Sequence, residues 1–143
     1  YKQAMIKRYM ALDVGDSSIG LALSDPLGIS SQPSGTIAND KNCLAAIKEI
    51  ISEKEVSTIV IGIPYMLDGS ASEQTEKVQK FSEKLSKELA ESGVKIDFFD
   101  ERLSTKEAER ILQGSKLKNK KKSQALDSIA ASLILESYLM SQN

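Results

Sequence analysis

Carboxylates at predicted strand ends are the residues of this sequence best suited to chemistry. Asp13 follows the apolar run 10–12, and the pair Asp100 and Glu101 follows an apolar stretch that ends at Phe99. A carboxylate at the end of a buried strand is unfavourable unless a cation meets it. Ligands of open α/β sheets bind beyond the carboxyl ends of the strands, so we expect these carboxylates to be neighbours.

A third acidic position lies near the C-terminus. Asp127 precedes Ala130 and Ala131 by three and four residues in a predicted helix over 124–138. These small side chains share its helical face, so the helix can approach the sheet closely and bring Asp127 to the same edge. The alternative is a surface carboxylate near a helix N-terminus, where the helix dipole favours negative charge.

The composition restricts the chemistry that these residues can perform. The chain has no histidine and one cysteine, Cys43, which excludes Cys/His zinc sites, Ser-His-Asp triads and Cys-His pairs. We expect Cys43 to be buried rather than reactive. Converging carboxylates repel one another and need a cation, and oxygen-only ligands suit Mg²⁺ or Mn²⁺. Two such ions support phosphodiester hydrolysis, so the sequence predicts a metal-dependent nuclease.

Two glycines lie in the turn region of a predicted β-hairpin over residues 9–25. Gly15 and Gly20 permit positive φ and let the backbone approach a bulky anion, so we expect them to contact nucleic acid. The alternative interpretation makes Asp13 and Asp16 ordinary turn formers.

The order of predicted elements indicates an α/β fold. Three antiparallel strands come first, and right-handed βα crossovers follow, which gives a mixed five-stranded sheet with helices on both faces. We expect Asn39 or Asp40 to cap the first helix, and Ser70 with Glu73 to form a capping box for a helix that Gly93 ends. The other predicted elements are an edge strand over 28–37, strands over 56–63 and 94–99, a short helix over 104–112, a loop over 115–123 and the helix over 124–138.

Length and composition fit one domain over residues 1–143, of which 1–7 are expected to be flexible or the remnant of a tag. No apolar run approaches a membrane span, and we expect a cytoplasmic protein. The net charge of −1 argues against a strongly basic nucleic-acid binder, although residues 114–143 carry five lysines against two acids. The basic loop before the last helix can reach a phosphate backbone, or be a solvated loop. Its candidate contacts are Lys118, Lys120, Lys121 and Lys122, and Arg102 is a further one.

Several of these motifs together resemble one family, and they run in the same order over nearly the whole chain. They are Ala11-Leu-Asp-Val-Gly15, Ile19-Gly-Leu-Ala-Leu-Ser-Asp-Pro26, Ile61-Gly-Ile-Pro64 with Asp68-Gly69, Asp100-Glu-Arg-Leu-Ser-Thr105, and Asp127-Ser-Ile-Ala-Ala131. The chain resembles the YqgF/RuvX family. The resemblance implies a ribonuclease H-like fold and a bacterial cytoplasmic nuclease, which matures the 5′ end of small-subunit (16S) ribosomal RNA or resolves Holliday junctions.

The resemblance also implies roles for particular residues. Asp13, Glu101 and Asp127 match the acidic triad of the family and would carry catalysis and metal binding, with Glu101 preferred to Asp100 by the motif. The implied partner is nucleic acid, either structured RNA or branched DNA, bound by a monomer or a homodimer. The chain has Ser17 and Ser18 where family members often carry a Lys-Arg pair.

Two other classes of protein remain in view. The glycine-containing hairpin also resembles the first phosphate loop of actin-like ATPases and sugar kinases, which need two such domains to enclose a nucleotide. A non-catalytic module could keep the fold and bind ribosomal RNA or a protein. Changing Asp13 to Asn would leave such a module intact and would inactivate a nuclease.

Overall fold

The computed structural model of the chain describes residues 7–102 and 119–142. Its core is one five-stranded sheet in the order β3-β2-β1-β4-β5. The strands are β1 (Arg8–Val14), β2 (Ser18–Ser24), β3 (Ser31–Ala38), β4 (Val56–Ile63) and β5 (Lys95–Asp100). The helices are α1 (Cys43–Lys54), α2 (Glu73–Glu88) and α4 (Asn119–Ser141).

The pairing of the strands confirms the predicted mixed sheet. β1 and β3 run antiparallel to β2, whereas β4 runs parallel to both β1 and β5. β3 lies at one edge, as its content of Pro33 and Gly35 predicted. The carboxyl ends of β1, β4 and β5 therefore lie at the same end of the sheet.

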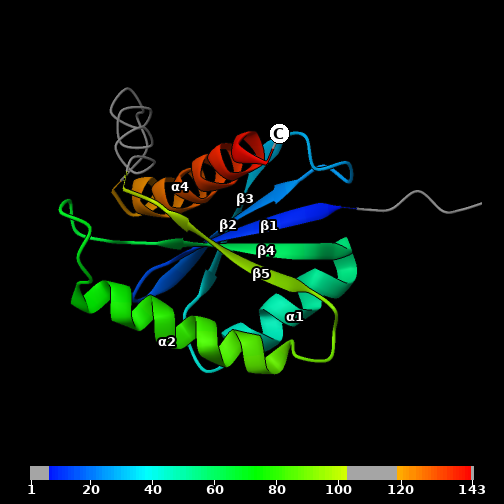
Figure 1. Cartoon of the computed structure of the whole chain (residues 1–143), viewed down its shortest axis with the longest axis horizontal. Coiled ribbons are helices and arrows are strands. Elements are labelled where there is room, and N and C mark those ends of the chain that lie inside the picture. Colours follow the sequence, from blue (N-terminus) through cyan, green and yellow to red (C-terminus); the bar gives the residue numbers. More distant parts are fainter. Residues whose placement is uncertain (1–6, 103–118, 143) are drawn as a thin grey trace, which may run out of the picture.

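Helices cover both faces of the sheet, as the sequence predicted. Figure 1 shows α1 and α2 on one face and α4 across the other. Side chains alternate between the two faces along each strand. In β1, Met10, Leu12 and Val14 pack with α1 and α2, whereas Ala11 packs under α4. The position of Asp13, two residues after Ala11, therefore places its side chain on the α4 face.

The starts of α1 and α2 differ from the predicted caps. The N-cap of α1 is Asn42, without a side-chain cap bond, rather than Asn39 or Asp40. The capping box of α2 joins Ser72 and Thr75, and the helix ends at Glu88 rather than near Gly93. Ser70 lies two residues before the N-cap, and its hydroxyl and its N–H both donate to Asp68 Oδ1, which closes a separate turn before the helix.

The last helix is longer than predicted. α4 begins at Asn119, so Lys120, Lys121 and Lys122 belong to its first turn rather than to a loop, consistent with the good helix propensity of lysine. Asp127 lies more than two turns from the start, beyond the reach of the helix dipole. The buried face of α4 includes Ala130, Ala131, Ile134 and Leu135, whereas Leu126, Ile129 and Leu133 are half-buried.

Two further predictions concern the segment after β5 and the lack of a membrane span. The short helix predicted over 104–112, like residues 1–6, lies outside the described residues. Among the helices that the structure describes, none is long and apolar enough to cross a membrane.

Candidate active site

The ends of β1, β4 and β5 bring two of the predicted acidic residues together. Asp13 pairs with Gly20 in the ladder between β1 and β2, one residue before β1 ends. Asp100, the last residue of β5, pairs with Ile63, the last residue of β4. The N–H of Glu101 donates to the carbonyl oxygen of Ile63 at 3.2 Å, which fixes the backbone of Glu101 just beyond the strand.

Asp100 and Glu101 have opposite surroundings although they are adjacent in sequence. The Asp100 carboxylate accepts from Arg102 Nε at 2.8 Å and forms an ion pair with its Nη2 at 2.6 Å. The Arg102 hydrogen bond lowers the pKa of Asp100. The Glu101 side chain instead forms a hydrogen bond with Asp13. The structure thus brings Glu101, and not Asp100, to Asp13.

Burial dominates the electrostatics of Asp13 and Glu101. Loss of water, followed by the negative charge of Asp13, raises the pKa of Glu101 to about 8. Burial, followed by the charge of Asp127, raises the pKa of Asp13 to about 6, although the Glu101 hydrogen bond lowers it. Two carboxyl groups can share a hydrogen bond only when one is protonated. Near neutral pH the pair therefore holds one proton, mainly on Glu101.

The second oxygen of Glu101 is an unusual buried group. Glu101 Oε2 is buried and has no hydrogen-bond partner among the described residues. A Cβ atom added at Gly62 of β4 would overlap this oxygen and would lie 2.6 Å from Ile134 Cδ1. Gly62 therefore makes room for the Glu101 carboxyl group. Sequence reasoning assigned Gly62 no role, although a glycine inside a β-branched strand is a recognised signal of close approach.

Gly20 has a packing role that the sequence did not predict, and the contact of Gly15 and Gly20 with nucleic acid stays a prediction. Neither Gly15 nor Gly20 is among the residues with positive φ. A Cβ atom at Gly20 would overlap the backbone carbonyl of Asp127, so the missing side chain lets α4 lie directly on β2. This close approach confirms the expectation that a small helical face would deliver Asp127 to the sheet.

The Asp127 carboxylate is held by a residue that sequence reasoning did not select. Ser18 Oγ donates to Asp127 Oδ2 at 2.8 Å from the first position of β2. Asp127 is close enough for its charge to raise the pKa of Asp13. As their side chains stand, no three His, Cys, Asp or Glu residues within 7–102 and 119–142 form a group able to hold a metal ion. The structure thus joins Asp13 to Glu101 directly, and holds Asp127 beside them on Ser18.

The predicted nucleic-acid contacts are only partly described. Arg102 is engaged by Asp100 and donates from Nη1 to the carbonyl oxygen of Leu67 at 3.2 Å. Lys118 lies outside the described residues, as do the side chains of Lys120, Lys121 and Lys122. Their contact with nucleic acid stays a prediction.

The fold places the chain in a known structural class. It is similar to Thermus thermophilus RuvC in complex with a Holliday junction substrate, with a TM-score of 0.60 and 13% identity over 96% of each chain. It is also similar to the fowlpox virus resolvase in complex with Holliday junction DNA, with a TM-score of 0.58 and 14% identity over 94% of this chain and 98% of that one. These similarities define a ribonuclease H-like fold.

Sequence similarity identifies the family more narrowly. The model of the RuvX family, described as Holliday junction resolvase, matches residues 7–141. The chain is 41% identical to a Koribacter versatilis protein over 92% of this chain and 86% of that protein, and 42% identical to a Clostridioides difficile protein over 92% and 93%. A Fusobacterium nucleatum protein is 43% identical over 94% and 97%. All three are named "Putative pre-16S rRNA nuclease". The chain belongs to the RuvX family.

Proposed function

We propose that this chain is a divalent-metal-dependent nuclease that hydrolyses phosphodiester bonds near the 5′ end of precursor 16S rRNA. The observation that carries the proposal is the buried Glu101 carboxyl group, with one oxygen bonded to no described partner, facing Asp13 at the carboxyl ends of β1 and β5. The 16S rRNA substrate is taken from the names of relatives that are 41–43% identical.

The residues of the site fit Mg²⁺ or Mn²⁺. Asp13, Glu101 and Asp127 offer only carboxylate oxygens, the donors that these hard cations prefer. A cation would satisfy Glu101 Oε2 and would offset the repulsion that raises the pKa of Asp13. When bound, such ions generate a nucleophile from water and stabilise charge on the leaving oxygen.

The chain's own residues prepare the site by controlling protons and side-chain positions. Glu101 must release the proton that it shares with Asp13 before both carboxylates can act as ligands. Asp127 would have to bind the cation in addition to, or instead of, the Ser18 hydroxyl. Gly62 leaves room for the Glu101 carboxyl group, and Gly20 lets the backbone of Asp127 approach the sheet. We therefore expect cleavage to rise with pH as the Asp13–Glu101 pair loses its proton.

A second candidate activity is the resolution of Holliday junctions. It is favoured by the family, which is described as Holliday junction resolvase, and by a fold shared with two junction resolvases. Both activities would use the same carboxylates, so the substrate alone distinguishes them.

The decisive experiment is a cleavage assay run in parallel on precursor 16S rRNA fragments and on four-way DNA junctions, with Mg²⁺ or Mn²⁺. We expect metal-dependent cleavage of the RNA near the mature 5′ end, and loss of that cleavage in Asp13→Asn with folding preserved. Faster cleavage of the junction would instead select the resolvase activity. Binding without cleavage of either substrate by the wild-type protein would reject the nuclease and leave a non-catalytic module.

A further inference from the structure

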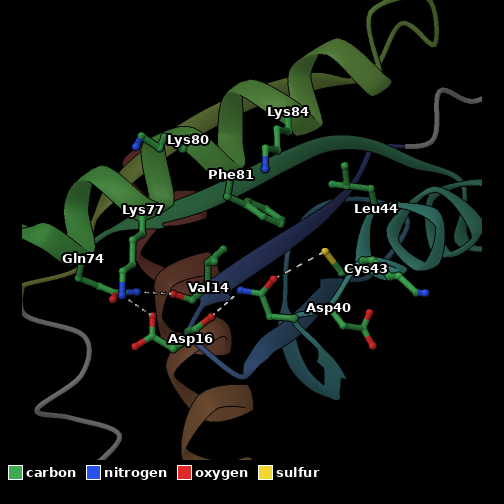
Figure 2. Close-up of a pocket in the computed structure, with 13 residues that line it drawn as sticks. Val14, Asp16, Asp40, Cys43, Leu44, Gln74, Lys77, Lys80, Phe81 and Lys84 are labelled. Atoms are coloured by element: carbon green, nitrogen blue, oxygen red, sulfur yellow. Dashed lines mark hydrogen bonds and ion pairs between the residues drawn. The ribbon is translucent and has the colours of Figure 1, made fainter.

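A groove lies at the same end of the sheet as the carboxylates but on the opposite face. It has a volume of about 600 Å³ and is bounded by the β1–β2 turn, the start of α1 and the first three turns of α2. Val14 lines it, and this residue packs with the α1–α2 core rather than under α4. Figure 2 shows the groove between α2 and the turn that carries Asp16.

Lysines dominate the charged lining of the groove. Lys77, Lys80 and Lys84 come from α2 at positions i, i+3 and i+7, which share one face of a helix, and Lys41 comes from the segment before α1. All four are exposed. The only acidic residues among the lining are Asp16 and Asp40, so the lining carries a net charge of +2.

The four lysines differ in how far ion pairs offset their charge. Lys77 Nζ lies 3.3 Å from Asp16 Oδ1 and 3.8 Å from Glu73 Oε1, so its charge is partly offset. Lys41, Lys80 and Lys84 form no ion pair with any residue that the structure describes. Lys84 points into the groove in Figure 2, toward Phe81.

The floor of the groove is apolar. Val14 is buried, and Phe81 and Leu44 are half-buried against the core, with Cys43 beside them. A basic rim over an apolar, partly aromatic floor is the arrangement that binds single-stranded nucleic acid, because lysines follow the phosphates while bases lie on apolar surface. From Lys77 to Lys84 the rim runs about 10 Å along α2, since a helix rises about 1.5 Å per residue. Such a row suits a linear polyanion better than one compact phosphate.

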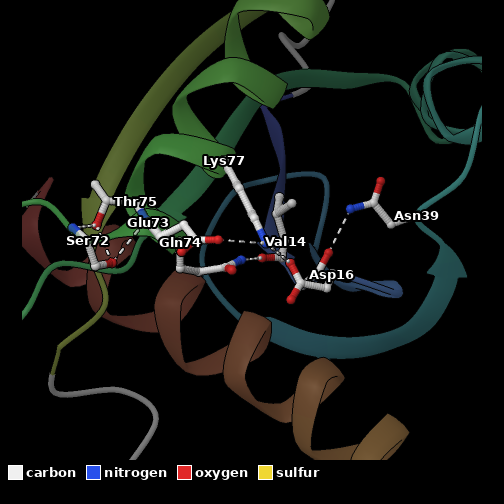
Figure 3. Close-up of polar contacts among 9 residues, drawn as sticks. Val14, Asp16, Asn39, Ser72, Glu73, Gln74, Thr75 and Lys77 are labelled. Atoms are coloured by element: carbon white, nitrogen blue, oxygen red, sulfur yellow. Dashed lines mark hydrogen bonds and ion pairs between the residues drawn. The ribbon is translucent and has the colours of Figure 1, made fainter.

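The groove is connected to the active site through the β1–β2 turn. Asn39 Nδ2 donates to the Gly15 carbonyl oxygen at 2.6 Å, and Gln74 Nε2 donates to the Val14 carbonyl oxygen at 3.3 Å. Figure 3 shows Gln74 and Lys77 of α2 meeting this turn from one side and Asn39 from the other. Gly15 comes two residues after Asp13, so a strand bound in the groove would lie next to the end of β1.

We infer that this groove binds a single-stranded segment of the nucleic-acid substrate that flanks the bond to be cleaved. The inference rests on the proposed nuclease function and extends it to substrate selection. A substrate whose strand continues past the cleavage point as unpaired nucleotides gains the lysine contacts, whereas a blunt duplex does not.

The test compares two double variants in the non-cleaving Asp13→Asn background. Lys80→Ser with Lys84→Ser removes two charges from the groove. Lys87→Ser with Lys95→Ser removes two exposed charges that do not line it, so it controls for net charge. The probe is a short RNA duplex with or without a ten-nucleotide single-stranded uridine tail, and affinity is measured from 50 to 300 mM salt.

We expect the groove variant to bind the tailed duplex about tenfold more weakly at low salt. Its salt slope should fall by about 1.4, because each phosphate contact to a single strand contributes about 0.7. The blunt duplex should show no difference between the two variants. Equal binding of the tailed duplex by both variants would overturn the inference, and so would equal weakening by both. Displacement of the tail by millimolar uridine monophosphate would overturn it in favour of a mononucleotide site.

The outcome is separable from that of the proposed function. If the groove variant binds normally while wild-type protein cleaves and Asp13→Asn does not, the nuclease stands and the groove assignment fails. If wild-type protein cleaves nothing but the groove variant loses affinity for the tail, the groove stands and the catalytic assignment fails.

Discussion

The two faces of one sheet end carry acidic residues with contrasting behaviour. On the α4 face, Asp13 and Glu101 are held in a buried cradle, and the pKa of each is raised. On the α1–α2 face, Asp16 is largely exposed and pairs with Lys77 across an open groove. The difference follows from the covering helices: α4 lies directly on Gly20 and excludes water, whereas α2 reaches the turn through the side chains of Gln74 and Lys77 and leaves an open groove. The depth of cover, and not the residue type, decides how far burial raises the pKa of a carboxyl group.

Substitutions of the adjacent residues Glu101 and Asp100 test this comparison, and they have the largest expected effect on the cleavage rate. Glu101→Gln should reduce metal-dependent cleavage about 10³-fold, or about 4 kcal/mol of transition-state stabilisation, because it removes a ligand oxygen from the cradle. Asp100→Asn removes the same charge from a carboxylate that Arg102 already engages, and should reduce cleavage by less than about tenfold. Single-turnover rates on one substrate measure both. The reverse ranking of these two variants would show that the site is built on Asp100.

The close cover of α4 can be tested through stability. Gly20→Ala should lower the free energy of unfolding by about 3 kcal/mol, because the added methyl group overlaps the Asp127 carbonyl and forces α4 off β2. Gly35→Ala is the matched control. Its Cβ meets nothing within 4 Å, so only its φ of 86° is unfavourable, at about 1 kcal/mol. Urea unfolding compares the two, and an equal loss would contradict the role of helix approach at Gly20.

The raised pKa values predict how the stability of the metal-free protein depends on pH. Asp13 and Glu101 bind protons more tightly when folded than their ordinary pKa values of 3.8 and 4.5 allow in the unfolded chain. The folded state therefore holds more protons between about pH 4 and pH 8. Stability from this pair is full below about pH 4 and is lost as pH rises through about 6 and then about 8.

Two measurements sharpen that prediction. Thermal unfolding in the presence of a chelator should give a falling melting temperature from pH 5 to pH 8, and Glu101→Gln should flatten the decline. Adding Mg²⁺ should raise the melting temperature more at pH 8 than at pH 5, since protons compete with the cation for the same oxygens. A melting temperature that Mg²⁺ leaves unchanged at pH 8 would count against a metal site in the cradle.

The smallest expected effect concerns Ser18. Ser18→Ala removes the hydrogen bond to Asp127 Oδ2 and should lower the stability of the metal-free protein by about 1 kcal/mol. If the hydroxyl only holds Asp127 in the absence of metal, Mg²⁺ affinity measured by calorimetry should be unchanged or slightly tighter in the variant. A weaker affinity would mean that the Ser18 bond orients Asp127 for binding.

Much of the architecture could be predicted from local patterns. β-branched runs, turn residues and the change from hairpins to βα crossovers were sufficient for the five strands and for helices on both faces. Errors arose where neighbouring serines could each begin the same helix. Ser70 closes a turn with Asp68, and the capping box of α2 forms at Ser72 and Thr75 instead. The packing face of α4 also depended on which side chains the sheet could accept.

By itself, the sequence determined the chemical class of this protein. A chain without histidine and with carboxylates at strand ends has oxygen ligands and little else for catalysis, and its motif order matches the RuvX family. Tertiary structure decided which carboxylates are paired and buried. Asp100 and Glu101 are adjacent in sequence, yet Arg102 engages one and Asp13 meets the other. Gly20 and Gly62 matter because of atoms contributed by α4 and by Glu101, which follows β5. Burial, and with it the pKa of Asp13 and Glu101, depends on contacts between distant segments, which no local pattern encodes.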